Sequence, residues 1–284
     1  MDLMDPPVAA GHSAPGDAKS ARGVEVRVEG VRHAFPSHGT AVRVLWDLDV
    51  TIPAGQFISV VGPSGCGKTT MLAMLGGLVR SRAGRVTMGG VEVTGPPRDA
   101  AYMLARDALL PWRTAVENVE LGLQVRGMRR AERRRLGLDW LKRVGLADFA
   151  HYNVLRLSQG MRQRVAIART LALNPRCILM DEPFAALDAQ TRTILQQEFL
   201  KLWERERPTV FLVTHDVSEA VLLSDRAILM SRRPGRVLLD LHIDLPRPRA
   251  KVAPMEDQRF QRYCRDLEHM LRQEIESLDP EKPQ

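Results

Sequence analysis

The 284-residue sequence has few cysteines, few aromatic residues and no long apolar run. Its three cysteines, Cys66, Cys177 and Cys264, are odd in number and widely scattered, which argues against a disulfide framework and a zinc site and fits a reducing cytosol. No apolar run reaches the roughly 18 residues that a membrane-spanning helix needs. The N-terminal segment lacks the apolar region of a secretory signal, and its Pro, Gly and Ser content predicts a disordered leader over residues 1–22.

Negative charge is in deficit, with 34 Asp and Glu against 41 Lys and Arg. The resulting formal charge of +7 is compatible with binding to nucleic acid or to an anionic membrane surface. The densest basic cluster is RGMRRAERRR at 126–135. Nucleic-acid platforms interleave aromatic residues with basic ones, and this cluster contains none. We therefore interpret it as a solvated helix face and expect no nucleic acid partner.

Short apolar runs separated by helical sequence predict a parallel α/β sheet. VEVRVEGV at 24–31 alternates with period two, which predicts a half-exposed strand, and RVTMGGVEV at 85–93 predicts a hairpin. The Arg- and Leu-rich residues from about 106 to 165 predict a helical insertion within the sheet. The predicted buried strands are QFISVVG (56–62), CILMD (177–181), TVFLVTHD (209–216) and RAILMS (226–231).

The segment GPSGCGKTT follows the pattern G-x-x-x-x-G-K-[ST] and stands between a buried strand and an apolar helix, which is typical of a P-loop. A plain glycine-rich turn is the alternative. In a P-loop, backbone N–H groups face the phosphates, Lys68 reaches the β and γ oxygens, and the Thr69 hydroxyl ligates Mg²⁺. We therefore predict an ATP and Mg²⁺ site formed by Gly62, Pro63, Ser64, Gly65, Cys66, Gly67, Lys68, Thr69 and Thr70.

Two carboxylates and a histidine stand where two predicted strands end. CILMDE ends in Asp181 and Glu182, and VTHD contains His215. Two adjacent anions at the end of a buried strand are costly unless a cation is near. Asp181 is placed to hold Mg²⁺ and Glu182 to polarise the attacking water. His215 is placed to approach the γ-phosphate, with a purely structural histidine as the alternative.

A second anion site is predicted at RLSQGMRQR, residues 156–164. Ser158 stands at the N-cap position of a helix, and Arg162 and Arg164 follow it. A capped helix N-terminus presents free N–H groups and a favourable dipole to an anion. The chain therefore has two phosphate sites in its sequence, although one P-loop suffices to bind one nucleotide.

Taken in order, these motifs resemble the nucleotide-binding subunits of ABC transporters, over about residues 24–245. The signature is LSQGM (157–161), the D-loop is ALD (186–188), and His215 is the switch histidine. The resemblance implies a P-loop NTPase (RecA-like) α/β core with a parallel sheet, an N-terminal antiparallel β subdomain and the helical insertion. It divides the chain into the leader, an ATPase domain over 23–245, and a tail over 246–284.

The tail has apolar residues at helical spacing, which predicts one amphipathic helix that packs on the body. Docking of a partner is the alternative. The apolar residues of this stripe are Phe260, Tyr263, Cys264, Leu267, Met270, Leu271 and Ile275.

The resemblance also assigns roles that spacing alone does not. It implies that Phe35 stacks on adenine, with hydrophobic cover as the alternative, and that two subunits stack head to tail. Each ATP then lies between the P-loop (the Walker A motif, 62–70) of one chain and the signature of the other, which explains the second anion site. The residues implied to act on the partner's ATP are Ser158, Gln159, Gly160 and Met161, together with Asp188 of the D-loop.

Two residues depart from the family pattern. Gln159 stands where the signature has glycine, so its side chain is expected to point away from the phosphate. Ala105 stands where the family has a glutamine that contacts Mg²⁺. An extra water is the expected substitute ligand, and Arg106 or Asp107 are alternatives.

Four segments are similar to the nitrate, sulfonate and taurine import branch: DALLPWRTAVENV (107–119), RAERR, LSQGMRQR and RRPGRV (232–237). This similarity implies an ATPase subunit at the cytoplasmic face of the cell membrane, as a homodimer or a paired subunit. Its expected partners are integral membrane permease subunits and, indirectly, an extracytoplasmic solute-binding protein. A soluble ABC-type ATPase acting on nucleic acid or ribosomes is the rival function, but the expected second cassette or coiled-coil insertion is not seen. A non-hydrolysing binding module is disfavoured because Lys68, Asp181, Glu182 and His215 are all present.

Overall fold

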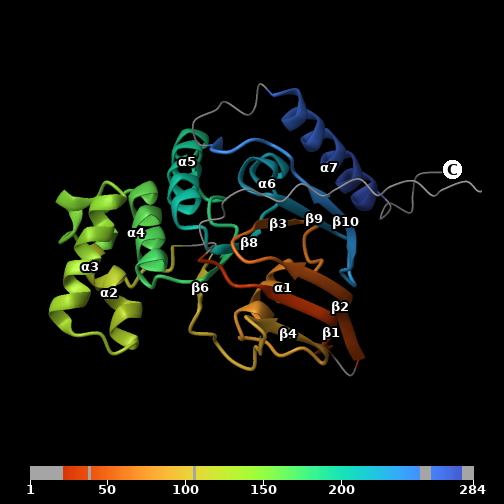
Figure 1. Cartoon of the computed structure of the whole chain (residues 1–284), viewed down its shortest axis with the longest axis horizontal. Coiled ribbons are helices and arrows are strands. Elements are labelled where there is room, and N and C mark those ends of the chain that lie inside the picture. The colour runs from red at the N-terminus through yellow and green to blue at the C-terminus, as the bar shows by residue number, and fades with distance from the viewer. Residues whose placement is uncertain (1–21, 38–39, 105–106, 250–256, 277–284) are drawn as a thin grey trace, which may run out of the picture.

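The computed structural model describes residues 22–37, 40–104, 107–249 and 257–276. A six-stranded sheet occupies the centre, a smaller antiparallel sheet lies on one side of it, and a helical segment projects from its edge (Figure 1). Within the described ranges, none of the helices combines the length and apolarity needed to cross a bilayer. The predicted leader, apart from Arg22, and the departure at Ala105 lie outside the described residues.

The smaller sheet is antiparallel throughout, with strand order β2-β1-β4-β5. The alternation of VEVRVEGV predicts a half-exposed strand, and Val26, Val28 and Val31 are indeed buried. The predicted turn at Gly89 and Gly90 joins the last two strands. This arrangement confirms the antiparallel N-terminal subdomain. Its strands are β1 (Val26–Ser37), β2 (Thr40–Ile52), β4 (Ala83–Met88) and β5 (Val91–Glu92).

The central sheet has the strand order β10-β9-β3-β8-β7-β6 and is parallel except at β10. The four apolar runs of the sequence form β3, β7, β8 and β9, as predicted. Because parallel strands end at the same edge of a sheet, the segments that follow β3, β7 and β8 converge there. The strands are β3 (Phe57–Val61), β6 (Ala100–Met103), β7 (Cys177–Asp181), β8 (Thr209–Val213), β9 (Arg226–Met230) and β10 (Val237–His242).

Each face of the central sheet has its own core. On β3, Phe57 and Val61 join the core formed with α4 to α7, while Ile58 and Val60 join the core shared with α1 and the smaller sheet. The strands are therefore covered on both faces, which is why they read as continuous apolar runs. The helices outside the insertion are α1 (Lys68–Leu75), α5 (Ala189–Glu206), α6 (Val217–Leu223) and α7 (Gln258–Glu276).

The helical insertion contains α2 (Ala115–Val125), α3 (Arg130–Arg143) and α4 (Gln159–Ala172). A capping box begins α2, since the Thr114 hydroxyl accepts from the Glu117 N–H and the Glu117 carboxylate accepts from the Thr114 N–H at 2.8 Å. The predicted boundary at residue 165 falls inside α4. This helix contacts α2 and α3 on one side and β6 and α5 on the other, so the insertion and the core share it.

The predicted tail helix is α7, which packs against α6 (Figure 1). Phe260, Cys264 and Leu267 are buried in the core on that face of the sheet. Only the end of the stripe departs from the prediction, because Ile275 is 47% exposed. Packing on the body is therefore confirmed for most of the apolar stripe.

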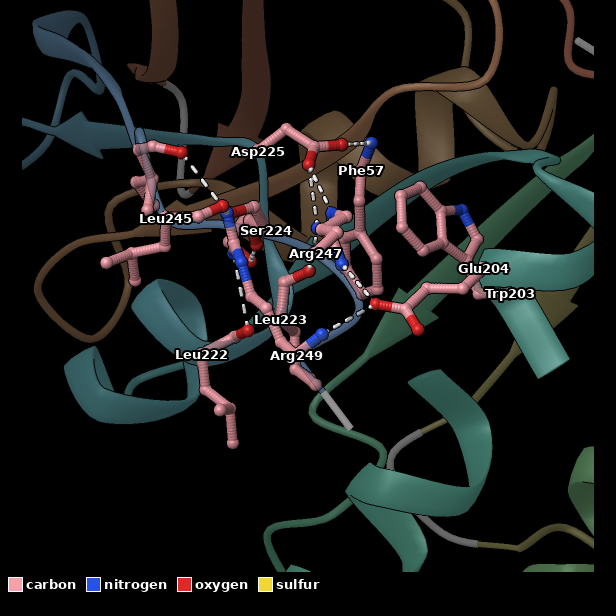
Figure 2. Close-up of polar contacts among 12 residues, drawn as sticks. Phe57, Trp203, Glu204, Leu222, Leu223, Ser224, Asp225, Leu245, Arg247 and Arg249 are labelled. Carbon is pink, nitrogen blue, oxygen red and sulfur yellow. Dashed lines mark hydrogen bonds and ion pairs between the residues drawn. The ribbon is translucent and has the colours of Figure 1, made fainter. Parts of the chain in front are cut away.

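Two arginines fasten the segment after β10 to the helices (Figure 2). The Arg247 guanidinium binds Asp225 and Glu204 and lies 4.3 Å above the Trp203 ring. Arg249 is 2% exposed, and its backbone N–H donates to Glu204 at 2.9 Å. These contacts place the start of the predicted tail inside the packed body. The segment that follows residue 245, where the sequence divides the ATPase domain from the tail, is therefore packed against the helices up to Arg249.

The Arg249 guanidinium caps the C-terminal end of α6. It donates to five backbone carbonyls, and the shortest contact, 2.5 Å, is with Ser224. Burial lowers the pKa of Arg249 to about 10, so the side chain remains a cation at neutral pH. A cation at this end of a helix is favoured by the helix dipole. The other four carbonyls belong to Val221, Leu222, Ile243 and Leu245.

We expect Arg249→Met to lower the free energy of unfolding by about 3 to 5 kcal/mol, because it leaves buried carbonyls without a donor. Urea denaturation followed by circular dichroism measures the change. Arg265→Met on the exposed side of α7 is the matched control, with an expected change within about 0.5 kcal/mol. Equal midpoints for the two variants would show that the carbonyl contacts contribute nothing to stability.

Candidate functional site

The P-loop connects β3 to α1 with a backbone that requires glycine. Gly67 has φ +110°, and a Cβ there would lie 2.5 Å from the Leu45 side chain. Lys68, at the first position of α1, is buried. Its Nζ donates to the carbonyls of Gly62 at 2.7 Å and Pro63 at 2.9 Å. The loop therefore curls around its own lysine.

An open cavity of about 490 Å³ lies against this loop. One end is apolar, where Phe35, 42% exposed, stands edge-on to His33 with a ring separation of 4.6 Å. The other end is polar, formed by the P-loop and Glu182. A cavity with an aromatic end and a phosphate-binding end has the polarity of a nucleotide. Its lining residues are Phe35, Pro36, Val42, Val44, Ser64, Gly65, Gly67, Lys68, Thr69, Thr70, Glu182 and Arg233.

Thr69 and Asp181 meet beside the P-loop. The Thr69 hydroxyl donates to Asp181 at 3.3 Å, although the two residues are 112 positions apart in the chain. Burial raises the pKa of the Asp181 carboxyl, with the hydrogen bond from Thr69 acting in the opposite direction. A hydroxyl and a carboxylate are the oxygen ligands that Mg²⁺ prefers. The pair therefore fits the metal role predicted from the sequence.

Glu182 and His215 come together at the ends of β7 and β8. The His215 Nδ1 lies 3.2 Å from a Glu182 carboxylate oxygen, and the histidine side chain is 63% exposed. The backbone of Glu182 is left-handed, with φ +45°, and its N–H donates to the Val213 carbonyl at 2.9 Å. This turn directs Glu182 into the cavity wall. The two residues are thus paired, and only Glu182 lines the cavity.

The signature residues form the first turn of α4. The Ser158 hydroxyl accepts from the Met161 N–H at 3.3 Å, which confirms the predicted cap. The Gln159 side chain donates to the Ala186 carbonyl at 2.5 Å, and a Cβ on Gly160 would lie 2.7 Å from the Thr191 side chain. None of the four signature residues lines the P-loop cavity of the same chain.

Comparison with known proteins agrees with this geometry. A family model described as ABC transporter matches residues 45–185. An uncharacterised ABC transporter ATP-binding protein of Methanocaldococcus jannaschii is 44% identical over 252 residues, or 89% of this chain and 93% of that protein. The chain belongs to the ABC transporter family. As an ATP-binding subunit of this family, it is an ATPase that hydrolyses ATP to drive transport.

Two further relatives of this ABC transporter ATPase carry more specific descriptions. The taurine import ATP-binding protein TauB of Yersinia pestis is 44% identical over 210 residues, covering 74% of this chain and 82% of TauB. A solved ATP-binding cassette, described as dimeric, post-hydrolysis and bound to ADP and Pi, aligns with a TM-score of 0.69 at 34% identity. That alignment covers 78% of this chain and 100% of the solved one.

The two arginines that follow the signature of this ABC ATPase do not join an anion site within their own chain. Arg162 binds the Asp107 carboxylate at 2.9 Å, and Arg164 binds Glu198 at 3.3 Å. Carboxylates from elsewhere in the fold therefore engage both arginines within one chain. Asp107, one of the alternatives for the substitute Mg²⁺ ligand, is thus paired with Arg162 of α4. Ala105 and Arg106 lie outside the described residues.

The D-loop residue Asp188 has a structural role that is visible in one ABC subunit. Its carboxylate accepts from the Thr191 N–H at 2.9 Å and so caps α5. This hydrogen bond lowers the pKa of Asp188, which keeps the carboxylate ionised. The Gln159 side chain donates to the carbonyl of Ala186, which lies two residues before Asp188. The D-loop and the signature of one chain therefore form a single connected surface.

The sequence did not predict four residues of the nucleotide cavity, the apolar-end residues Pro36, Val42 and Val44 and the charged residue Arg233. Arg233 lines the cavity, and its guanidinium donates to the Gly65 carbonyl at 3.1 and 3.2 Å. RRPGRV is recognisable in the sequence only as a marker of the import branch. Nothing local in that segment indicates that it returns to the P-loop 168 residues away.

Proposed function

We propose that this ATPase powers the import of a small anion or organic solute, of the nitrate, sulfonate or taurine class, through separate permease subunits. The observation that carries the proposal is the 44% identity to a taurine import ATP-binding protein over 82% of that protein's length. The import-branch segments lie in the loop before α2 and its first turn, in α3, at the start of α4, and in the loop after β9.

The site supports a specific division of labour. Lys68 exchanges the carbonyls of Gly62 and Pro63 for the β and γ oxygens of ATP, since both are oxygen acceptors for one ammonium group. Thr69 and Asp181 hold Mg²⁺, which neutralises charge on the phosphates when bound. Glu182 orients and polarises the attacking water, and its partner His215 approaches the γ-phosphate.

We propose that two chains stack head to tail, as a homodimer or with a paired subunit. Support comes from the signature, which lines no part of its own P-loop cavity, and from the dimeric state of the solved relative. In such a dimer Ser158 and Gly160 face the partner's ATP, with Gln159 and Met161 completing the turn. Asp188 lies at the same surface. Closure of the pair on ATP and reopening after hydrolysis is the conformational step that a permease senses.

The proposed location is the cytoplasmic face of the cell membrane, as a peripheral subunit bound to integral permease subunits. A solute-binding protein on the other side of the membrane contributes indirectly. The proposed ATPase domain covers residues 23–245, and the contacts of Arg247 and Arg249 pack the start of the tail, 246–284, against it. No observation on the described residues favours the rival function, an ATPase that acts on nucleic acid or ribosomes.

Uptake of labelled taurine, an alkanesulfonate and nitrate into a deletion strain tests the function. We expect loss of uptake of one of these solutes, its recovery with the wild-type gene, and no recovery with Lys68→Ala. Unchanged uptake of all three solutes in the deletion strain contradicts the proposed import class.

Phe35 provides a separate test of the nucleotide site. Phe35→Ala should weaken ATP binding by about five- to tenfold, because stacking of a base on an aromatic ring is worth about 1–3 kcal/mol and this ring is partly exposed. Phe35→Tyr, which keeps the ring, should bind like the wild type. Isothermal titration with ATP measures both, and inorganic triphosphate serves as the ligand without a base. An equal loss for ATP and triphosphate would exclude stacking.

A further inference from the structure

We propose that Arg233 is a phosphate-binding residue of the nucleotide site, in addition to the residues of the P-loop. The inference rests on the proposed role of that site, and it assigns a function to a loop outside the recognised motifs. The loop, residues 231–236, joins β9 to β10 at the edge where the P-loop begins. The ligand class is the anionic phosphate chain of ATP or ADP.

Arg233 is positioned in the wall of the nucleotide cavity. Arg233 lines the same cavity as Lys68 and Thr69. Its Nε and Nη2 donate to the Gly65 carbonyl at 3.2 and 3.1 Å, which places the guanidinium against the backbone of the P-loop itself. A guanidinium has five N–H donors in a fixed plane, so donors remain for a phosphate oxygen after these two contacts.

Backbone contacts hold the 231–236 loop in place before any ligand binds. The Gly235 N–H donates to the Val44 carbonyl at 2.8 Å, and the Trp46 N–H donates to the Gly235 carbonyl at 3.1 Å. Gly235 also packs so closely that a Cβ there would lie 2.2 Å from the Cys66 carbonyl oxygen. The loop is therefore clamped between β2 and the P-loop, which reduces the entropy lost when Arg233 binds an anion.

The positive charge of Arg233 also favours an anionic ligand. Arg233 is exposed, and within the described residues the hydrogen bonds of its guanidinium go to the Gly65 carbonyl. Its partner is a neutral carbonyl, so its charge is not compensated locally. A phosphate oxygen forms a stronger hydrogen bond with a guanidinium than a carbonyl does, because both groups are charged. The bound nucleotide thus provides the counter-charge that the apo loop lacks.

The neighbouring arginine Arg236 supplies a matched control. It belongs to the same loop and is exposed, but it does not line the cavity. Its backbone N–H donates to the Ser231 hydroxyl at 2.9 Å, an interaction that a side-chain substitution leaves intact. Arg233→Gln and Arg236→Gln therefore remove the same charge from the same loop at two different distances from the P-loop.

The experiment measures the KM for ATP, kcat, and the affinity for ADP in the purified full-length chain. We expect Arg233→Gln to raise KM for ATP and Kd for ADP about tenfold with kcat within about twofold of wild type, which is the scale of one charge-assisted hydrogen bond. Arg233→Lys, which keeps the charge without the planar fork, should lie between these values. Arg236→Gln should match the wild type.

Equal losses in Arg233→Gln and Arg236→Gln overturn the inference, because they indicate a general effect of net charge. A loss of kcat without a change in KM or in ADP affinity also overturns it. Urea denaturation of each variant shows whether the fold is kept, and a destabilised Arg233→Gln with normal ADP affinity counts against the proposal. If wild type and Lys68→Ala bind ATP equally, the proposed nucleotide site itself fails, which is a distinct outcome.

Discussion

Glu182→Gln is expected to bind ATP normally and to lose between about 10² and 10⁴ of its turnover, the usual cost of removing a group that activates water. The substitution keeps the size of the side chain at the end of β7 while removing the carboxylate that faces His215 at 3.2 Å. Binding should persist, because the P-loop contacts of Lys68 do not involve Glu182. The variant should therefore accumulate as an ATP-bound dimer.

Phosphate release and size-exclusion chromatography with and without ATP measure the two consequences. Glu132→Gln, on the exposed surface of α3, is the matched control for loss of one carboxylate. We expect it to hydrolyse ATP at the wild-type rate and to show no trapped dimer. Near-wild-type phosphate release from Glu182→Gln would remove Glu182 from its assigned role.

The features that could be predicted from the sequence depend on residues that lie a few positions apart. The P-loop depends on glycines a few residues apart and on a buried strand before it, so GPSGCGKTT predicts the loop and a helix after it, which is α1. Asp181 ends β7 and His215 follows the end of β8, and the apolar runs of both strands are visible in the sequence. Parallel strands end at one edge, and this rule brings them to the same place.

The features that could not be predicted depend on pairs far apart in the chain. Arg162 finds Asp107 at a separation of 55 residues, and Arg233 finds Gly65 at a separation of 168. No periodicity or motif encodes such pairs, because each requires the packed positions of two elements. For the same reason the sequence does not indicate that Arg249 packs against α6, since it donates to carbonyls 25 or more residues away.

Complementation between two inactive variants locates the second anion site. Lys68→Ala disables the P-loop of its own chain. Ser158→Arg places a long side chain at an exposed position of the signature, where on the proposed reading it obstructs the partner's ATP. Each homodimer then contains two spoiled sites and should be nearly inactive. Ser158→Ala is the control, because it removes the α4 cap without adding a long side chain. A cap contributes about 1 kcal/mol to stability, so this variant separates loss of the cap from obstruction of the partner's ATP.

In a mixed dimer of these two variants, one site combines both lesions. The other site joins the intact P-loop of the Ser158→Arg chain to the intact signature of the Lys68→Ala chain. One complete site is therefore restored only if the signature acts on the partner's nucleotide. The position of the signature supports this expectation, because its residues do not line the P-loop cavity of their own chain. Differently tagged chains allow the mixed dimer to be purified, and nucleotide-dependent dimerisation is measured beside ATPase activity because coupling between the two sites can suppress turnover alone. A confirmed mixed dimer that neither traps nor hydrolyses ATP, while Ser158→Arg still binds ATP in its own P-loop, would place the signature outside a shared site.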